Sequence, residues 1–290
     1  MAEKYILQPT TQHILWGGAV EILCFGRDTG DWSLRDEVPE MPGYPRPEVV
    51  EAIGRLANAY DCRIYAPKTS AFNAQIVEAR ELADALVEDR FFRGVEADGV
   101  ILREPRQAFA VSSADCPTFV LWDSITSTVV ATHAGRDSLI PPRLVTGAYR
   151  RWDRGPRSAI QNAISAMPMS GLHGGNSRFG SFVTCGIGPT HFEHPMRNPH
   201  GANKGNNALV KWIRITYGDD CLRGDPAHGM VNLNHIIRRQ CIQKGMYPER
   251  IGYDGVDTFA DRYPDGGHMW HSHRRNGDGT RNLVLVVRRR

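Results

Sequence analysis

The sequence predicts a single α+β domain, because two kinds of apolar pattern occur in it. Short β-branched runs, such as 20–26, 119–123 and 128–135, have the length and composition of buried strands. Longer segments, such as 45–60 and 230–246, repeat their apolar residues at helical spacing. A chain of 290 residues can bury a substantial core without disulfide staples. We therefore expect residues 1–290 to form one domain.

Composition and charge argue against several classes of protein. The 35 basic residues nearly balance 32 acidic ones, and the net charge of +3 does not favour a nucleic-acid-binding protein. No apolar stretch approaches the length of a membrane span, and residues 1–16 lack the apolar run of a signal peptide. The six cysteines form no CxxC pair, which is typical of a reduced protein. We expect a cytoplasmic protein with neither a nucleic-acid nor a membrane partner.

Strands are predicted wherever apolar runs are separated by turn residues. The runs 109–113, 119–123 and 128–135 are expected to be neighbouring strands of one sheet. Further strands are expected over 20–26, 63–79 and 182–189. The segment 268–287 predicts a hairpin, because an Asn-Gly-Asp-Gly turn separates two strand-like halves.

Helices are predicted where apolar residues recur every three or four positions. In 45–60 a proline and a glutamate open the helix, and Val50, Ile53 and Leu56 form its apolar face. Similar patterns predict helices over 81–92, 158–167, 206–218 and 230–246.

Cys116 and His133 are the strongest candidates for a reactive site. They lie 17 residues apart in the chain, about one strand, one turn and one strand, so a hairpin can bring them to the same end of a sheet. A thiolate beside an imidazole is either a soft metal site or a nucleophile and its base. The alternative is structural, because free cysteines usually behave as small buried apolar residues. Spacing alone leaves these three readings open.

Several segments together resemble the laccase-domain family. Ala-Asp-Cys-Pro at 114–117, followed by a strand and His-Ala-Gly at 133–135, is similar to the family's Ala-Asp-Cys-x-Pro and His-Ala-Gly-Trp-Arg-Gly patterns. Other segments that resemble family motifs, in the same order along the chain, are 25–35, 47–57, 185–195 and 270–286. Family members are described as polyphenol oxidases and as purine nucleoside phosphorylases with adenosine deaminase activity.

The resemblance implies packed β-sheets flanked by helices and a metal-dependent enzyme that processes purine nucleosides. It implies that Cys116 and His133 are both catalytic residues and ligands of Zn or Cu, which would activate water or polarise the substrate. It also implies a small nucleoside or a phosphorylated compound as substrate. The residues expected to contact this substrate are Arg27, Asn73, Arg136, Arg274 and Arg275, since guanidinium groups suit phosphate.

This chain departs from the family pattern at two places. The family's first histidine ligand is missing, and Phe72 or Asn73 stands nearest to its position. Asparagine is a poor ligand for a borderline metal, so His271 or His273 is considered as the third ligand. In addition, Arg136 stands where the family has tryptophan, which predicts a preference for anionic substrates.

Two other functions remain open. The first is a metal-free cysteine hydrolase with Cys116 as nucleophile and His133 as base, since the family's fold is similar to that of deamidating toxins. The second is a catalytically inactive descendant that binds a nucleoside-like ligand. The missing histidine favours both of these over the metal enzyme.

Overall fold

The computed structural model describes residues 5–34, 45–69, 74–140, 158–167, 178–194, 203–223 and 229–290. Two mixed β-sheets account for most of the strands in these ranges. The seven-stranded sheet contains, in spatial order, β1 (Thr11–Leu15), β2 (Val20–Phe25), β15 (Asn282–Arg288), β8 (Gln107–Ser113), β3 (Arg63–Tyr65), β6 (Phe91–Phe92) and β5 (Leu86–Glu88). The six-stranded sheet contains β14 (Ile251–Tyr253), β11 (Phe179–Thr184), β9 (Thr118–Asp123), β10 (Val129–His133), β7 (Gly99–Leu102) and β4 (Ile76–Glu78).

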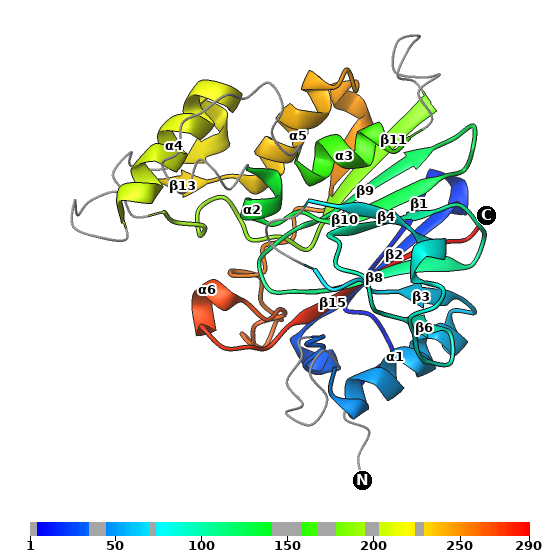
Figure 1. Cartoon of the computed structure of the whole chain (residues 1–290). Coiled ribbons are helices and arrows are strands. Elements are labelled where there is room, and N and C mark those ends of the chain that lie inside the picture. The colour runs from blue at the N-terminus through cyan, green and yellow to red at the C-terminus, as the bar shows by residue number, and fades with distance from the viewer. Residues whose placement is uncertain are drawn as a thin grey trace.

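Helices cover the outer faces of both sheets, so the fold has four layers (Figure 1). α1 (Pro47–Ala59) packs on the seven-stranded sheet, and its apolar face contributes Val49, Ile53 and Leu56 to the core there. α3 (Ala159–Ser165), α4 (Asn203–Tyr217) and α5 (Leu233–Gln243) belong to the core of the six-stranded sheet. The remaining short elements are α2 (Arg136–Leu139), α6 (His273–Asn276), the pair β12 (Leu222–Arg223) and β13 (Met230–Val231), and the 3-10 helices Trp16–Gly18, Arg27–Thr29, Ala79–Leu82, Asp219–Cys221 and Pro248–Arg250. The expected α+β architecture of packed sheets flanked by helices is therefore confirmed.

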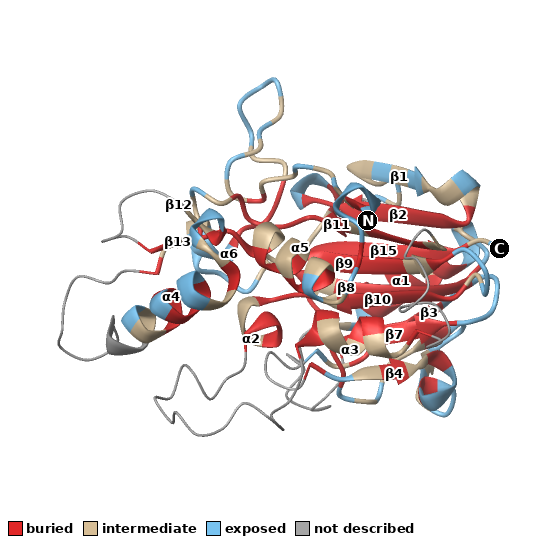
Figure 2. Cartoon of the chain, turned by 90° about the horizontal axis from the view of Figure 1, so that it is seen from above, coloured by how far each residue is buried: buried red, intermediate tan, exposed pale blue. Residues whose placement is uncertain are grey.

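The central strands are mostly apolar because both of their faces are buried, and β15 is buried along its whole length (Figure 2). Side chains alternate between the two faces of a strand. In β15, Leu283, Leu285 and Val287 pack toward α1, whereas Val284 and Val286 enter the core between the sheets. The same alternation occurs in β2, where Ile22 and Cys24 face the other sheet. The core between the sheets holds the two sheets in a fixed arrangement. The candidate site lies where the chain passes from β8 in one sheet to β9 in the other.

Four predictions about individual elements are wrong. The run 109–113 lies in β8, which belongs to the other sheet from β9 and β10, so the chain crosses between the sheets just before β9. The predicted helix 81–92 forms a short 3-10 helix followed by β5 and β6. The first half of the predicted hairpin 268–287 is no strand, because Ser272 accepts a hydrogen bond from the Arg275 backbone and starts the helical turn α6 instead. The predicted strand 63–79 divides into β3 and β4, in different sheets.

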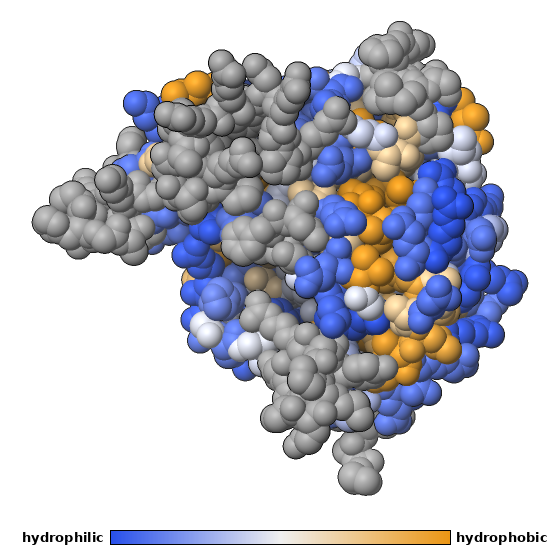
Figure 3. Space-filling model, viewed as in Figure 1, coloured by the Kyte–Doolittle hydropathy of each residue, from blue (hydrophilic) through white to orange (hydrophobic). Residues whose placement is uncertain are grey.

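Hydrophilic residues cover much of the face shown in Figure 3, around a gathering of hydrophobic residues. No helix in the described ranges has the length and apolar character needed to cross a bilayer.

Candidate functional site

Cys116 lies on the connection that carries the chain from β8 in one sheet to β9 in the other. The connection is short and well anchored, because the Ser113 hydroxyl donates to the Cys116 carbonyl oxygen at 2.8 Å. His133 is the last residue of β10 and pairs with Thr118 in β9, two positions after Cys116. The antiparallel β9–β10 pairing thus brings thiol and imidazole to the same end of the sheet, as the spacing predicted.

The Cys116 sulfur and the His133 ring are close neighbours. A Cβ atom added at Gly135 would lie 3.0 Å from Cys116 Sγ and 3.4 Å from His133 Nε2. Two atoms that near a common point cannot be more than about 7 Å apart, so the thiol and the imidazole belong to one site. Gly135 allows this approach, since any larger residue there would collide with the ring.

Asp98 lies behind His133 and completes a row of three ionisable groups. Its Oδ1 is 3.6 Å from His133 Nδ1, and the Asp98 side chain is fully buried. The other carboxylate oxygen accepts hydrogen bonds from the Ala74 backbone at 2.8 Å and from the Ser138 hydroxyl at 3.0 Å. Neither His133 Nδ1 nor Asp98 Oδ1 has a hydrogen-bond partner in the described residues, so these two atoms face each other as an ion pair.

This arrangement favours a protonated His133. Burial by itself lowers the pKa of the ring, but the negative charges of Cys116 and Asp98 outweigh it and raise the pKa to about 10. The site therefore places a protonated His133 ring between the Cys116 sulfur and the buried Asp98 carboxylate at neutral pH. Asp98 is a site residue that the sequence analysis missed; the signal was an acidic residue directly before the apolar run 99–102.

Asp115 fixes the loop that carries Cys116. It adopts a φ of 92°, in the left-handed region that few residues other than glycine, asparagine and aspartate enter. Its buried carboxylate accepts hydrogen bonds from the Thr258 hydroxyl and from the Arg274 backbone, both at 2.8 Å. Asp115 thereby ties the Cys116 loop to the start of α6.

Replacing Asp115 with alanine is expected to destabilise the fold by about 3 kcal/mol, because two buried hydrogen bonds to a charged group are lost. Alanine also tolerates the positive φ less well than aspartate. Urea unfolding would measure the change. Asp115→Asn keeps an acceptor and the backbone preference, so its loss should be roughly half as large. Equal stability of the alanine variant and the unaltered protein would contradict the anchoring role.

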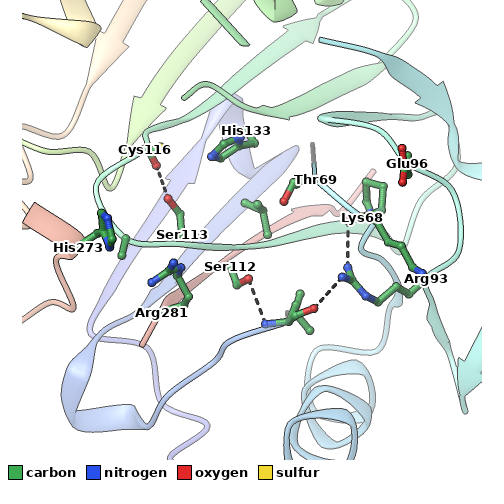
Figure 4. Close-up of a pocket in the computed structure, with 14 residues that line it drawn as sticks. Lys68, Thr69, Arg93, Glu96, Ser112, Ser113, Cys116, His133, His273 and Arg281 are labelled. Atoms are coloured by element: carbon green, nitrogen blue, oxygen red, sulfur yellow. Dashed lines mark hydrogen bonds between the residues drawn. The ribbon is translucent and has the colours of Figure 1, made fainter. Parts of the chain in front are cut away.

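Two cavities meet at Cys116 and His133. One has a volume of about 430 Å³. In Figure 4, Cys116, His133 and His273 lie toward one end of it, and Lys68, Arg93 and Glu96 toward the other. The second cavity, of about 620 Å³, extends past Gly135. Both are lined by Ala114, Cys116, His133 and His273, and the second also by Asp115, Arg136, Asp137, Phe192 and Arg274.

His194 lies behind Arg136, buried at 1 % exposure. The Arg136 guanidinium donates to its Nε2 at 3.4 Å, which requires a neutral ring that accepts at that atom. Burial, followed by repulsion from Arg136 and Arg274, lowers the pKa of His194 to about 4, although Asp137 opposes the shift.

The neutral His194 makes the fold sensitive to acid. In the unfolded chain the pKa of His194 is near 6.5, whereas in the folded chain it is about 4. As the pH falls from 6.5 toward 4, His194 therefore binds a proton in the unfolded chain but not in the folded one. The contribution of neutral His194 to the free energy of unfolding is fully present above pH 6.5. About 2 kcal/mol of it should be lost between pH 7 and pH 5. Urea unfolding at both pH values would show this, and His194→Gln should remove that part of the difference. An identical pH dependence in the two proteins would contradict it.

The structure does not bring all predicted substrate-binding residues together. Arg136 and Arg274 line the second cavity with Cys116 and His133. Arg27 is exposed and lines neither cavity. Arg275 also lies outside both, and its guanidinium donates to the backbone carbonyls of residues 258, 259 and 270, which is a structural role. Asn73 and Phe72 lie outside the described residues.

The described residues do not fit a three-ligand zinc or copper centre. In those ranges no group of three or more His, Cys, Asp or Glu side chains could hold a metal ion. Cys116 and His133 supply two donors. His271 directs its Nε2 to the Gly30 carbonyl oxygen, 3.2 Å away, and lines neither cavity. His273 lines both cavities but completes no such group.

Comparisons with known proteins agree with the fold. Residues 47–289 match the sequence model of a family described as multi-copper polyphenol oxidoreductase laccase. Similar solved structures include a Neisseria meningitidis protein assigned to family DUF152 (18% identity, 96% of this chain and 98% of that one, TM-score 0.64). Others are the hypothetical protein YfiH of Bacillus licheniformis (14%, 98% of both chains, 0.65) and YlmD of Geobacillus stearothermophilus (19%, 93% and 92%, 0.59). No curated protein matches this chain.

Proposed function

Because the chain belongs to the multi-copper polyphenol oxidoreductase laccase family, we propose that it is an enzyme whose reactive centre is the Cys116–His133 pair. In this proposal Cys116 is the nucleophile of a metal-independent hydrolase that acts on a small nucleoside-like substrate. The observation that carries it is the row Cys116–His133–Asp98, in which a thiol side chain, an imidazolium and a buried carboxylate follow one another.

The geometry suits nucleophilic catalysis for a physical reason. A nucleophile needs a nearby base, and the base needs a third group that orients it. His133 meets Cys116 on one side and Asp98 on the other, so a single ring orientation serves both contacts. The carboxylate is itself held by Ala74 and Ser138 and cannot turn away.

The reaction would proceed in two steps. The Cys116 thiolate bonds to an electrophilic carbon of the substrate, and the His133 imidazolium gives its proton to the departing nitrogen or oxygen. In the second step neutral His133 takes a proton from water, the water oxygen bonds to the same carbon, and the carbon–sulfur bond breaks to restore the thiolate. Protons and electron pairs balance over the cycle.

A second candidate is the metal-dependent phosphorolysis or deamination of purine nucleosides, which the resemblance of the sequence motifs implies. It needs a Zn or Cu ion held by Cys116, His133 and a third donor. Such an ion would supply Lewis-acid activation of the substrate or of water. This candidate is second because the described residues contain no group of three side chains that could hold the ion.

Alkylation and elemental analysis separate the candidates. After treatment with a chelator, the protein is incubated with iodoacetamide at pH 6 and the alkylated residue is found by mass spectrometry. We expect fast labelling of Cys116 in preference to the other five cysteines, which are all buried. Labelling should slow strongly in His133→Ala.

The opposite outcomes are informative too. One Zn or Cu per chain before chelation, lost in Cys116→Ala, would establish the second candidate instead. Labelling no faster than that of a cysteine peptide, together with no bound metal, would contradict both and favour a binding protein. Release of ammonia or base from adenosine, inosine and their monophosphates would then identify the substrate.

A further inference from the structure

The second cavity carries positive charge beside the nucleophile. Arg136 and Arg274 both line it, from α2 and α6. The two guanidinium groups are near enough for each other's charge to matter, since repulsion by Arg136 is second only to desolvation among the causes that lower the pKa of Arg274. Like charges gathered on one wall of a cavity are unfavourable unless an anion joins them.

The charges of Asp115 and Glu193 favour the protonated form of Arg274, but desolvation and repulsion from Arg136 outweigh them and lower its pKa. The Asp115 carboxylate receives its hydrogen bonds from the Thr258 hydroxyl and from the backbone nitrogen of Arg274, not from the guanidinium. The Arg274 guanidinium instead lies over the Phe192 ring, 4.8 Å from the centroid.

Arg136 is held in a fixed orientation. Its Nε and one terminal nitrogen donate to the two Asp137 oxygens at 2.7 and 3.0 Å. The other terminal nitrogen donates to the buried, neutral His194. A guanidinium fixed in this way loses little conformational freedom when it binds a ligand, and it retains N–H groups for one.

We propose that the cavity of Arg136, Phe192 and Arg274 binds an oxyanion of the substrate, a phosphate or carboxylate group. The rest of the substrate would extend into the first cavity, so that the attacked carbon lies over Cys116, where the two cavities meet. This inference rests on the proposed function, since it assumes that Cys116 is the nucleophile. The inference narrows the substrate class to molecules that join an anionic group to a larger neutral part, such as nucleoside monophosphates rather than free nucleosides.

Two alkylating reagents of similar size test the idea. Iodoacetate carries a carboxylate and iodoacetamide does not, so the ratio of their rates at Cys116 reports attraction of an anion to the site. We expect the ratio to fall by about tenfold in Arg274→Gln and in Arg136→Gln, because each variant removes one positive charge next to the thiol. The iodoacetamide rate should change much less. Arg250→Gln is the matched control, because Arg250 is exposed and lines neither cavity.

Protection experiments identify the kind of anion. Inorganic phosphate and acetate are each tested for slowing the iodoacetamide reaction, in the unaltered protein and in Arg274→Gln. Stronger protection by phosphate indicates a phosphorylated substrate, and stronger protection by acetate a carboxylate; either must weaken in the variant. An unchanged rate ratio in both arginine variants, with iodoacetamide still fast, overturns this inference and leaves the proposed function intact. Slow iodoacetamide labelling of the unaltered protein overturns the proposed function itself.

Discussion

The Asp98→Asn variant is expected to react with iodoacetamide at pH 6 roughly tenfold to a hundredfold more slowly at Cys116, since one pKa unit corresponds to a tenfold change in the population of a charged form. Asp98 Oδ1 faces His133 Nδ1 at 3.6 Å and favours the imidazolium. An asparagine that keeps its oxygen toward the Ala74 amide would turn its NH₂ group toward Nδ1. The ring would then lose its proton, and the thiolate would lose its counter-charge.

The measurement is the full pH–rate profile of alkylation, because a merely structural role would lower the rate without moving the profile. The profile of Asp98→Asn should move to higher pH, while circular dichroism shows an unchanged fold. Glu96→Gln is the control, since it removes a carboxylate that lines the first cavity but does not act on His133. An Asp98→Asn profile that overlays the original would show that Cys116 and His133 work without the carboxylate.

Introducing a histidine at position 73 is expected to tighten zinc binding by roughly 100-fold, because a third imidazole or thiolate donor completes a zinc site of the usual kind. The chain passes close to the pair directly after this position: the Ala74 amide is 2.8 Å from the Asp98 carboxylate, which in turn faces His133. Titration with a zinc buffer would measure the dissociation constants of Asn73→His and of Phe72→His, the neighbouring alternative.

Asn73→Gln is the matched control, and Cys116→Ala in the Asn73→His background should abolish the gain. If neither histidine variant binds zinc more tightly than the original chain, another histidine already completes the site, and the metal-dependent candidate gains support.

Much of this site could be predicted because its chemistry is local in the sequence. Cys116 and His133 are separated by one hairpin, and antiparallel pairing fixes the register that brings them together. The partners of that pair were harder to predict. Asp98 lies beside His133 because β7 pairs with β10. Arg274 lies near Cys116 because its backbone nitrogen donates a hydrogen bond to the Asp115 carboxylate, next to Cys116 in the chain. Both contacts depend on tertiary packing, which no periodicity in the sequence encodes.

The wrong predictions have physical causes of the same kind. In 268–287 the Asn-Gly-Asp-Gly turn predicted a hairpin, but the capping hydrogen bond of Ser272 starts a helical turn just before it. This turn places Arg274 at the cavity and His271 away from it. In 109–123 the two apolar runs were expected to be adjacent, yet the core needs one strand in each sheet. A sequence pattern shows that a run is buried, but not which sheet buries it.

The position of β15 in the interior of its sheet has a consequence for how the chain folds. This strand lies between β2 and β8, and ion pairing joins Arg289 to Glu21, 268 residues earlier. Contacts between such distant residues carry a large loop-closure entropy and form slowly. During synthesis the edges of β2 and β8 that face β15 therefore stay unpaired until residues 282–288 have been made. Because unpaired apolar strand edges favour association between chains, we expect aggregation to be most pronounced during this interval.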